Sequence, residues 1–91
     1  MDDEERFHLR VSKNNIGQNR IIFIIPGKII KKAVSRNKIR RRAREILRKK
    51  EGQIKIGNDL TFIFKKGAEE QAYDKLEKEI SGALEKKGLI K

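Results

Sequence analysis

The chain has 91 residues, and 24 Lys and Arg against 13 Asp and Glu give it a net charge of +11 at pH 7. This length suits one modest core, so we expect residues 1–91 to form a single domain. The absence of cysteine excludes disulfides and thiolate metal sites, and a single His leaves few catalytic side chains. The absence of cysteine also favours the reducing cytoplasm as the compartment. No apolar run is long enough for a membrane span, and the acidic start is unlike a signal peptide.

The first two predicted elements are strands. Residues 7–12 alternate between apolar and polar side chains, which predicts a half-buried strand. A turn rich in Asn and Gly follows at residues 14–19. Residues 21–25 are a continuous apolar run that stops at Pro26 and is too short for a helix. This run predicts a central strand that is buried on both faces.

Helical spacing dominates the next part of the chain. A helix is predicted from about residue 33 to 50, with an apolar face of Ile39, Ala43, Ile46 and Leu47. Residues 28–32 do not continue that face and are predicted to form a connecting loop. Residues 60–64 predict a second apolar strand, and residues 72–84 predict a last helix that ends before Gly88. The predicted order is therefore β-β-α-β-α.

The net charge is concentrated in residues 28–50, where twelve basic residues face one acid, Glu45. The segments on either side carry equal numbers of basic and acidic residues. Within residues 36–48 there are six arginines and one lysine, and arginine is the side chain that binds phosphate oxygens bidentately. Such a helix is destabilised by like-charge repulsion, which indicates a polyanionic partner, most commonly a nucleic acid.

Other kinds of site find less support. The acidic side chains of the last helix alternate with lysines, which is typical of a solvated surface. His8 has no second His or Cys with which to share a metal, and Pro26-Gly27-Lys28 lacks the rest of a phosphate loop. The basic helix offers chiefly Asn37 for reading base edges, so phosphate contact and shape should dominate, and RNA is favoured over the DNA major groove.

Residues 33–45, Ala-Val-Ser-Arg-Asn-Lys-Ile-Arg-Arg-Arg-Ala-Arg-Glu, resemble the arginine-rich signature of the bacterial ribonuclease P protein component. Residues 57–64, residues 66–68 and the last helix with its Gly88-Leu89-Ile90 end resemble later segments of that family. The resemblance extends over residues 20–91.

The chain departs from the family pattern at two places. The family begins with a short helix that forms one wall of the cleft for the 5′ leader of precursor tRNA. No matching segment precedes Phe7, so we expect an N-terminally shortened member. The family's Ser-Lys-Lys-hydrophobic-Gly before the basic helix corresponds to Gly27-Lys28-Ile29-Ile30-Lys31, in which the glycine is replaced and one lysine is lost.

The resemblance implies a fold and a function. The fold is an α/β (α+β) two-layer sandwich resembling a ribosomal-protein domain, with a left-handed β-α-β crossover. The function is that of the protein subunit of ribonuclease P, a ribonucleoprotein endonuclease that removes the 5′ leader during tRNA maturation. Its partners are the catalytic RNA and precursor tRNA, with no membrane and no required protein partner. The RNA subunit binds Mg²⁺ and carries out the hydrolysis, so no catalytic or metal-binding protein residue is expected.

The implied RNA-binding residues lie in the loop and in the basic helix: Lys28, Lys31, Lys32, Arg36, Asn37, Lys38, Arg40, Arg41, Arg42, Arg44 and Arg48. Asn37 has two implied roles, orienting the loop or contacting RNA or a metal-bound water. The resemblance assigns what remains of the leader cleft to four residues of the first strand, namely Phe7, His8, Arg10 and Ser12. The alternation along this strand, however, directs Phe7 toward the core.

Two other functions fit the charge. One is a stand-alone ribosome- or structured-RNA-binding protein without a role in tRNA processing. The other is a nucleoid-type DNA binder, which would not need the Arg-Asn motif. A self-sufficient nuclease is disfavoured because the sequence offers no carboxylate cluster and no His pair.

Overall fold

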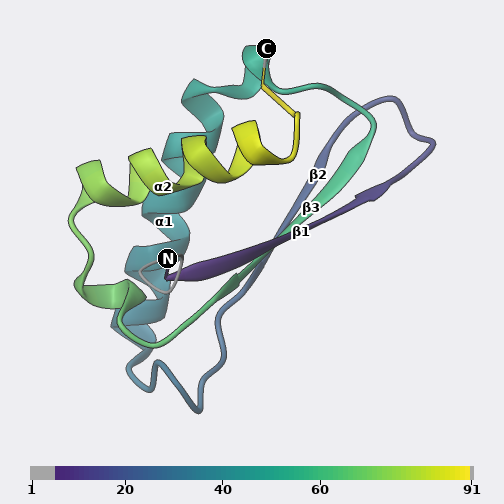
Figure 1. Cartoon of the computed structure of the whole chain (residues 1–91). Helices are drawn as coiled ribbons and strands as arrows, with labels where there is room; N and C mark the ends of the chain where they lie inside the picture. Colours follow the sequence, from purple (N-terminus) through teal and green to yellow (C-terminus); the bar gives the residue numbers. More distant parts are fainter. Residues whose placement is uncertain (1–5, 91) are drawn as a thin grey trace.

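The computed structural model describes residues 6–90. In chain order its elements are β1 (Phe7–Lys13), β2 (Arg20–Ile24), α1 (Ala33–Lys49), β3 (Asn58–Phe64) and α2 (Tyr73–Lys86). Single 3-10 turns at Glu51–Gln53 and Ala68–Glu70 lie on either side of β3. The predicted order β-β-α-β-α is confirmed. Both helices lie on the same face of the sheet, as Figure 1 shows, so the fold has two layers.

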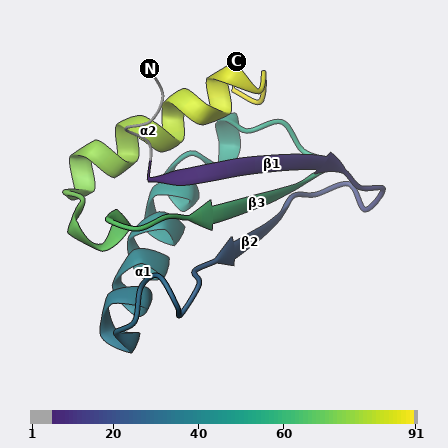
Figure 2. The ribbon, with the colours of Figure 1, turned by 60° about the horizontal axis from the view of Figure 1, so that its bottom comes forward.

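The strands form a sheet in the order β1-β3-β2 (Figure 2). β1 runs antiparallel to β3, whereas β2 runs parallel to it. Because two adjacent parallel strands cannot be joined by a tight turn, the chain must cross over between them. Helix α1 makes this crossover, so the structure contains the β-α-β unit that the resemblance implies.

The prediction that residues 21–25 form a central strand buried on both faces is wrong. The strand ends at Ile24 and lies at the edge of the sheet that residues 6–90 form. Ile21, Ile22 and Ile24 are 40%, 44% and 43% exposed. The central strand is β3, and no described helix covers the outer face of the sheet. An apolar run therefore lies here at a partly exposed edge.

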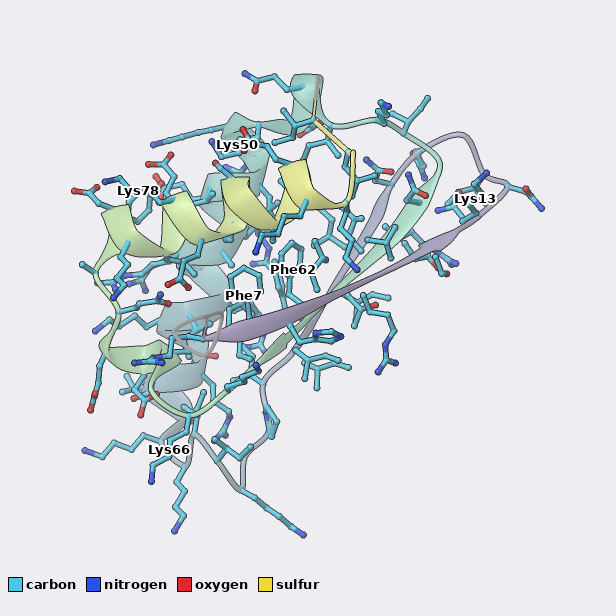
Figure 3. All side chains as sticks on the ribbon, viewed as in Figure 1. Phe7, Lys13, Lys50, Phe62, Lys66 and Lys78 are labelled. Atoms are coloured by element: carbon cyan, nitrogen blue, oxygen red, sulfur yellow. The ribbon has the colours of Figure 1, made fainter. Side chains whose placement is uncertain are left out.

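The core lies between the sheet and the two helices. Leu60, Phe62 and Phe64 alternate along β3 and are almost fully buried, as are Phe7 and Leu9 on β1. The Phe7 ring centroid lies 5.5 Å from that of Phe62, and both side chains point toward the helices in Figure 3. The helices contribute buried residues at helical spacing, namely Ile39, Ala43, Ile46 and Leu47 from α1 and Leu76, Ile80, Ala83 and Leu84 from α2.

Helix α2 ends at Lys86, shortly before Gly88, as the sequence predicted. The Gly88 N–H donates to the Glu85 carbonyl, and the Leu89 N–H donates to the Leu84 carbonyl, both at 2.9 Å. Gly88 has a φ of 72°, the left-handed conformation that this pair of hydrogen bonds requires. The turn directs Leu89, which is 6% exposed, back into the core.

Asp59, on β3, ties the three strands together at one end. It lies opposite Ser12 of β1 and Arg20 of β2 in the sheet register. Arg20 donates to both carboxylate oxygens at 2.9 Å, and the Asn14 side chain donates to Oδ1 at 2.9 Å. The hydrogen bonds from Arg20 and then Asn14 hold the pKa of Asp59 below its usual value. The β1–β2 turn is thereby anchored to the central strand.

This arrangement predicts an acid-dependent loss of stability. Because the folded-state pKa of Asp59 is lowered, its stabilisation is present above the unfolded-state pKa of about 4 and is lost as the pH falls through the folded value. We expect the Asp59→Asn variant to melt at a lower temperature than the wild type at pH 7. Its melting temperature should also fall less steeply between pH 5 and pH 3.

Thermal unfolding followed by circular dichroism at each pH would measure both effects. Asp74→Asn, at an exposed position of α2, is the control and should retain the steep acid-side fall of the wild type. Equal slopes for Asp59→Asn and the wild type would contradict the assignment.

Candidate nucleic-acid interface

Helix α1 carries the basic segment and is held by its apolar face. Ile39, Ala43, Ile46 and Leu47 are each 2% exposed or less, as the sequence predicted. The last turn contains Arg48 and no acid, which suits the negative end of the helix dipole. At the other end, Lys32 is the N-cap residue and makes no side-chain capping hydrogen bond. The basic side chains therefore occupy the sides of a helix whose rotation is set by the core.

Arg36 binds the loop that precedes the helix. Its Nη1 donates to the carbonyl oxygens of Ile30 and Lys31, each at 2.9 Å. Ile30 is a core residue, 1% exposed, while Ile29 points outward and is 44% exposed. Arg36 thus fixes the predicted connecting loop against the start of α1, and Lys28, Lys31 and Lys32 of that loop are exposed.

Two further arginines have partners within the protein. Nη1 of Arg42 donates to the backbone carbonyl of Gln71 at 2.8 Å, which links α1 to the segment before α2. Nη1 of Arg40 donates to the side-chain oxygen of Asn37 at 3.3 Å. Asn37 is exposed and lies on α1 itself rather than in the loop. Of the two residues in the Arg-Asn motif, it is Arg36 that holds the loop.

Arg41, Arg44 and Arg48 form an unpaired stripe. They are three and four residues apart, so they share one side of the helix, and all three are exposed. None of them makes a hydrogen bond or ion pair with any residue between 6 and 90. We call these three residues the arginine stripe. Its guanidinium groups keep all their donors for an external anion.

The candidate cleft residues on β1 divide between the two faces of the sheet. His8, Arg10 and Ser12 are exposed on the outer face, away from the helices. Phe7 is 1% exposed and packs in the core, so it is not available to a cleft on that face. The alternation of side chains along a strand separates them, since neighbouring residues point to opposite faces.

The outer face also contains apolar residues that the sequence reasoning did not assign to a site. In the sheet register His8 lies beside Ile63, which lies beside Ile24, and Arg10 is linked to Ile22 through Thr61. Ile22 and Ile24 were missed because their strand was predicted to be buried on both faces. The period-two pattern of β1 and the partner strands together define this surface, and no single segment does.

Among residues 6–90, no three His, Asp or Glu side chains lie close enough together to hold a metal ion. No helix in that range is long and apolar enough to cross a membrane.

The chain matches one known protein family over most of its length. The model of the family described as Ribonuclease P matches residues 3–88. The chain belongs to the ribonuclease P protein family. The ribonuclease P protein component of Syntrophomonas wolfei is 34% identical to it over 78 residues, which are 86% of this chain and 65% of that protein. The protein component from Alkaliphilus metalliredigens is 31% identical over 80 residues, 88% of this chain and 71% of that protein. The chain therefore spans about two thirds of the length of these relatives.

Solved ribonuclease P proteins have the same fold. The protein from Thermotoga maritima, in complex with 1-(4-fluorophenyl)-2-thiourea, superposes with a TM-score of 0.79 at 28% identity. The match includes 90% of this chain and 79% of the other. The Staphylococcus aureus protein superposes with a TM-score of 0.81 at 23% identity, over 94% of this chain and 78% of the other. The predicted α/β (α+β) two-layer sandwich is confirmed, as is the resemblance from which it came.

The two kinds of arginine should respond differently to truncation. Arg36→Ala leaves the carbonyls of Ile30 and Lys31 without their donor, so we expect a loss of about 1–2 kcal/mol in the free energy of unfolding. Arg44→Ala removes no hydrogen bond or ion pair within the described residues and should change stability by less than about 0.5 kcal/mol. Urea denaturation of both variants would measure this difference. Equal losses would show that Arg36 does not anchor the loop.

Proposed function

We propose that this chain is the protein subunit of ribonuclease P and binds the catalytic RNA through α1 to support removal of the 5′ leader from precursor tRNA. The observation that carries the proposal is the arginine stripe. In a chain of this family, Arg41, Arg44 and Arg48 are aligned on one side of a helix and have no partner among residues 6–90. An RNA backbone supplies phosphates that such a row can neutralise.

The electrostatics support a role in assembly. Eight of the basic residues lie on α1 with a single acid, so the isolated protein bears an uncompensated positive field. Binding to RNA releases counterions from its phosphates and relieves this repulsion at the same time. The protein would then reduce the repulsion between the catalytic RNA and a second RNA, the precursor tRNA. This screening should matter most when Mg²⁺ is scarce.

The chemistry is assigned to the RNA subunit, as the family resemblance implies. That subunit would bind the Mg²⁺ and carry out the hydrolysis. The protein's own residues would bind phosphates, with Lys28, Lys31 and Lys32 extending the basic surface beyond the start of α1. Arg36, Arg40 and Arg42 retain donors beyond the ones they use within the fold, because a guanidinium group has five N–H donors.

The outer face of the sheet is the surface that we assign to the 5′ leader. Unpaired nucleotides offer flat bases and phosphates, and this face offers Ile22 and Ile24 on β2 and Arg10 on β1, with β3 between them. His8 adds a flat ring that can stack on a base. Ser12 lies on the same face at the end of β1, opposite Asp59 in the sheet register. Phe7 would act only through the core.

Reconstitution tests the main proposal. The full chain would be mixed with a bacterial ribonuclease P RNA and precursor tRNA at low Mg²⁺, and release of the 5′ leader would be followed on a gel. We expect the protein to accelerate cleavage over RNA alone, and the effect should shrink as Mg²⁺ is raised. RNA binding without any acceleration would overturn the proposal and indicate a stand-alone RNA-binding protein.

Charge reversal tests the arginine stripe. The variant with Arg41→Glu, Arg44→Glu and Arg48→Glu should lose at least about a hundredfold in affinity for the catalytic RNA and should no longer stimulate cleavage. Its circular dichroism spectrum should remain that of the wild type, because the stripe makes no hydrogen bond or ion pair within residues 6–90 and the buried face of α1 is unchanged.

A matched control has the same change in net charge at exposed lysines outside the basic segment: Lys66→Glu, Lys75→Glu and Lys78→Glu. This control should bind the RNA several-fold more weakly at most and should still stimulate cleavage. If both triple variants behaved alike, net charge rather than the stripe would explain binding.

A pair of variants on β1 tests the leader surface. Arg10→Glu introduces a negative charge on the outer face, whereas Lys13→Glu makes the same change on the same strand but on the opposite side. We expect Arg10→Glu to weaken binding of the reconstituted enzyme to precursor tRNA about tenfold, on the order of one lost phosphate contact. Binding of mature tRNA, which lacks the leader, should not change. If the two variants weakened binding of precursor tRNA equally, the leader would not bind this face.

A further inference from the structure

A cleft lies beside the edge strand, on the opposite side of β2 from the surface assigned to the leader. Its volume is about 440 Å³, within the range of small-molecule sites. β2, the second half of α1 and the segment from Glu51 to Ile56 surround it, and the β1–β2 turn closes one end. Neither the strand pattern nor the helix pattern pointed to this cleft, because its walls come from four parts of the chain.

The floor of the cleft is apolar. Leu47 and Ile54 are buried, while Ile21 is 40% exposed and Ile56 is 69% exposed. Phe23 is half-buried, and its ring centroid lies 6.0 Å from that of Phe62, so core packing holds it in place. Large apolar side chains in a concave position can cover an apolar group of similar size.

The rim of the cleft is cationic. Arg44 and Arg48, two members of the arginine stripe, line it from α1 at i and i+4. Their like charges repel each other at this spacing, and neither has a partner among residues 6–90. Glu51 is the single acid among the lining residues. The cleft therefore pairs an apolar floor with two free guanidinium groups.

We propose that this cleft binds one unstacked nucleobase of a single-stranded RNA segment, with the flanking phosphates on Arg44 and Arg48. A base supplies the flat apolar group for Ile21, Phe23 and Ile56, and its own backbone supplies the negative charge for the rim. The guanidinium groups can also stack on the face of the base while they bind phosphate. The inference rests on the proposed function, because it identifies an additional contact made by the same RNA-binding helix.

Methyl spectroscopy of the full chain provides the test. Isoleucine δ1-methyl groups would be labelled, and the chain titrated with a 12-nucleotide oligo(A) and with a 12-mer of abasic ribose phosphates of equal charge. We expect ring-current shifts at the methyl groups of Ile21 and Ile56 with oligo(A) and none with the abasic 12-mer. Ile29, which lies in the loop before α1 and does not line the cleft, should not shift with either. Ile22 and Ile24 report separately on any base that binds the outer face.

A matched pair of variants measures the contribution of the cleft to the affinity for a base. Ile56→Ser removes one wall of the cleft, and Val34→Ser changes an equally exposed aliphatic residue of α1 outside the cleft. Since stacking of a base strengthens binding, we expect wild type to prefer oligo(A) over the abasic 12-mer by about tenfold. Ile56→Ser should reduce this preference to about threefold or less, and Val34→Ser should retain it.

The outcomes separate the two proposals. If Ile21 and Ile56 do not shift, or if Ile56→Ser and Val34→Ser show the same preference, the cleft proposal is overturned even when reconstitution succeeds. A third titration uses an acidic peptide, Glu-Phe-Glu-Phe-Glu. If this peptide shifts the two methyl groups and oligo(A) does not, the occupant is a protein segment and the RNA proposal fails. If reconstitution fails while oligo(A) shifts both methyl groups, the cleft still binds RNA, and only the assignment to ribonuclease P is wrong.

Discussion

The burial of one apolar stripe on α1 is the interaction on which the rest of the structure depends. The helix carries eight basic residues and one acid, and like charges at i,i+4 spacing cost a few tenths of a kcal/mol per pair. Burial of Ile39, Ile46 and Leu47 contributes about 1.5–3 kcal/mol for each side chain, and Ala43 adds close packing. Burial therefore exceeds repulsion by several-fold, and a strongly cationic helix remains folded before any partner binds.

The rotation imposed by this stripe divides the arginines into two groups. Those beside the apolar face, such as Arg36 and Arg42, reach backbone carbonyls of neighbouring segments and hold the helix to the loop and to the start of α2. Those on the exposed side, Arg44 among them, make no hydrogen bond or ion pair within residues 6–90. Arginine thus serves two purposes on this helix, and the position of each side chain around the helix axis decides which one it serves. An external anion can therefore bind the second group without breaking the hydrogen bonds made by the first.

Local patterns could predict the helix faces but not the positions within the sheet. The apolar spacing on α1 is a property of one segment, so periodicity identified Ile39 and Leu47 as buried. The run at residues 21–25 is equally apolar at the edge or at the centre of a sheet, and only the β1-β3-β2 order decides. The partners of Arg36 could not be foreseen either, because the path of the preceding loop places the Ile30 carbonyl beside it. The walls of the cleft come from four segments, so no pattern within one segment could predict it.

The edge position of β2 gives the molecule two surfaces instead of one. Ile22 and Ile24 face outward while Ile21 faces the cleft, so one short strand supplies apolar contacts to both. An exposed apolar edge strand ordinarily promotes pairing between copies of a protein. Here Arg44 and Arg48 lie beside the strand without an acidic partner among residues 6–90, so a second copy would bring cations against cations. Under the proposed function, the charge that would attract an RNA to this edge would also repel a second copy of the protein.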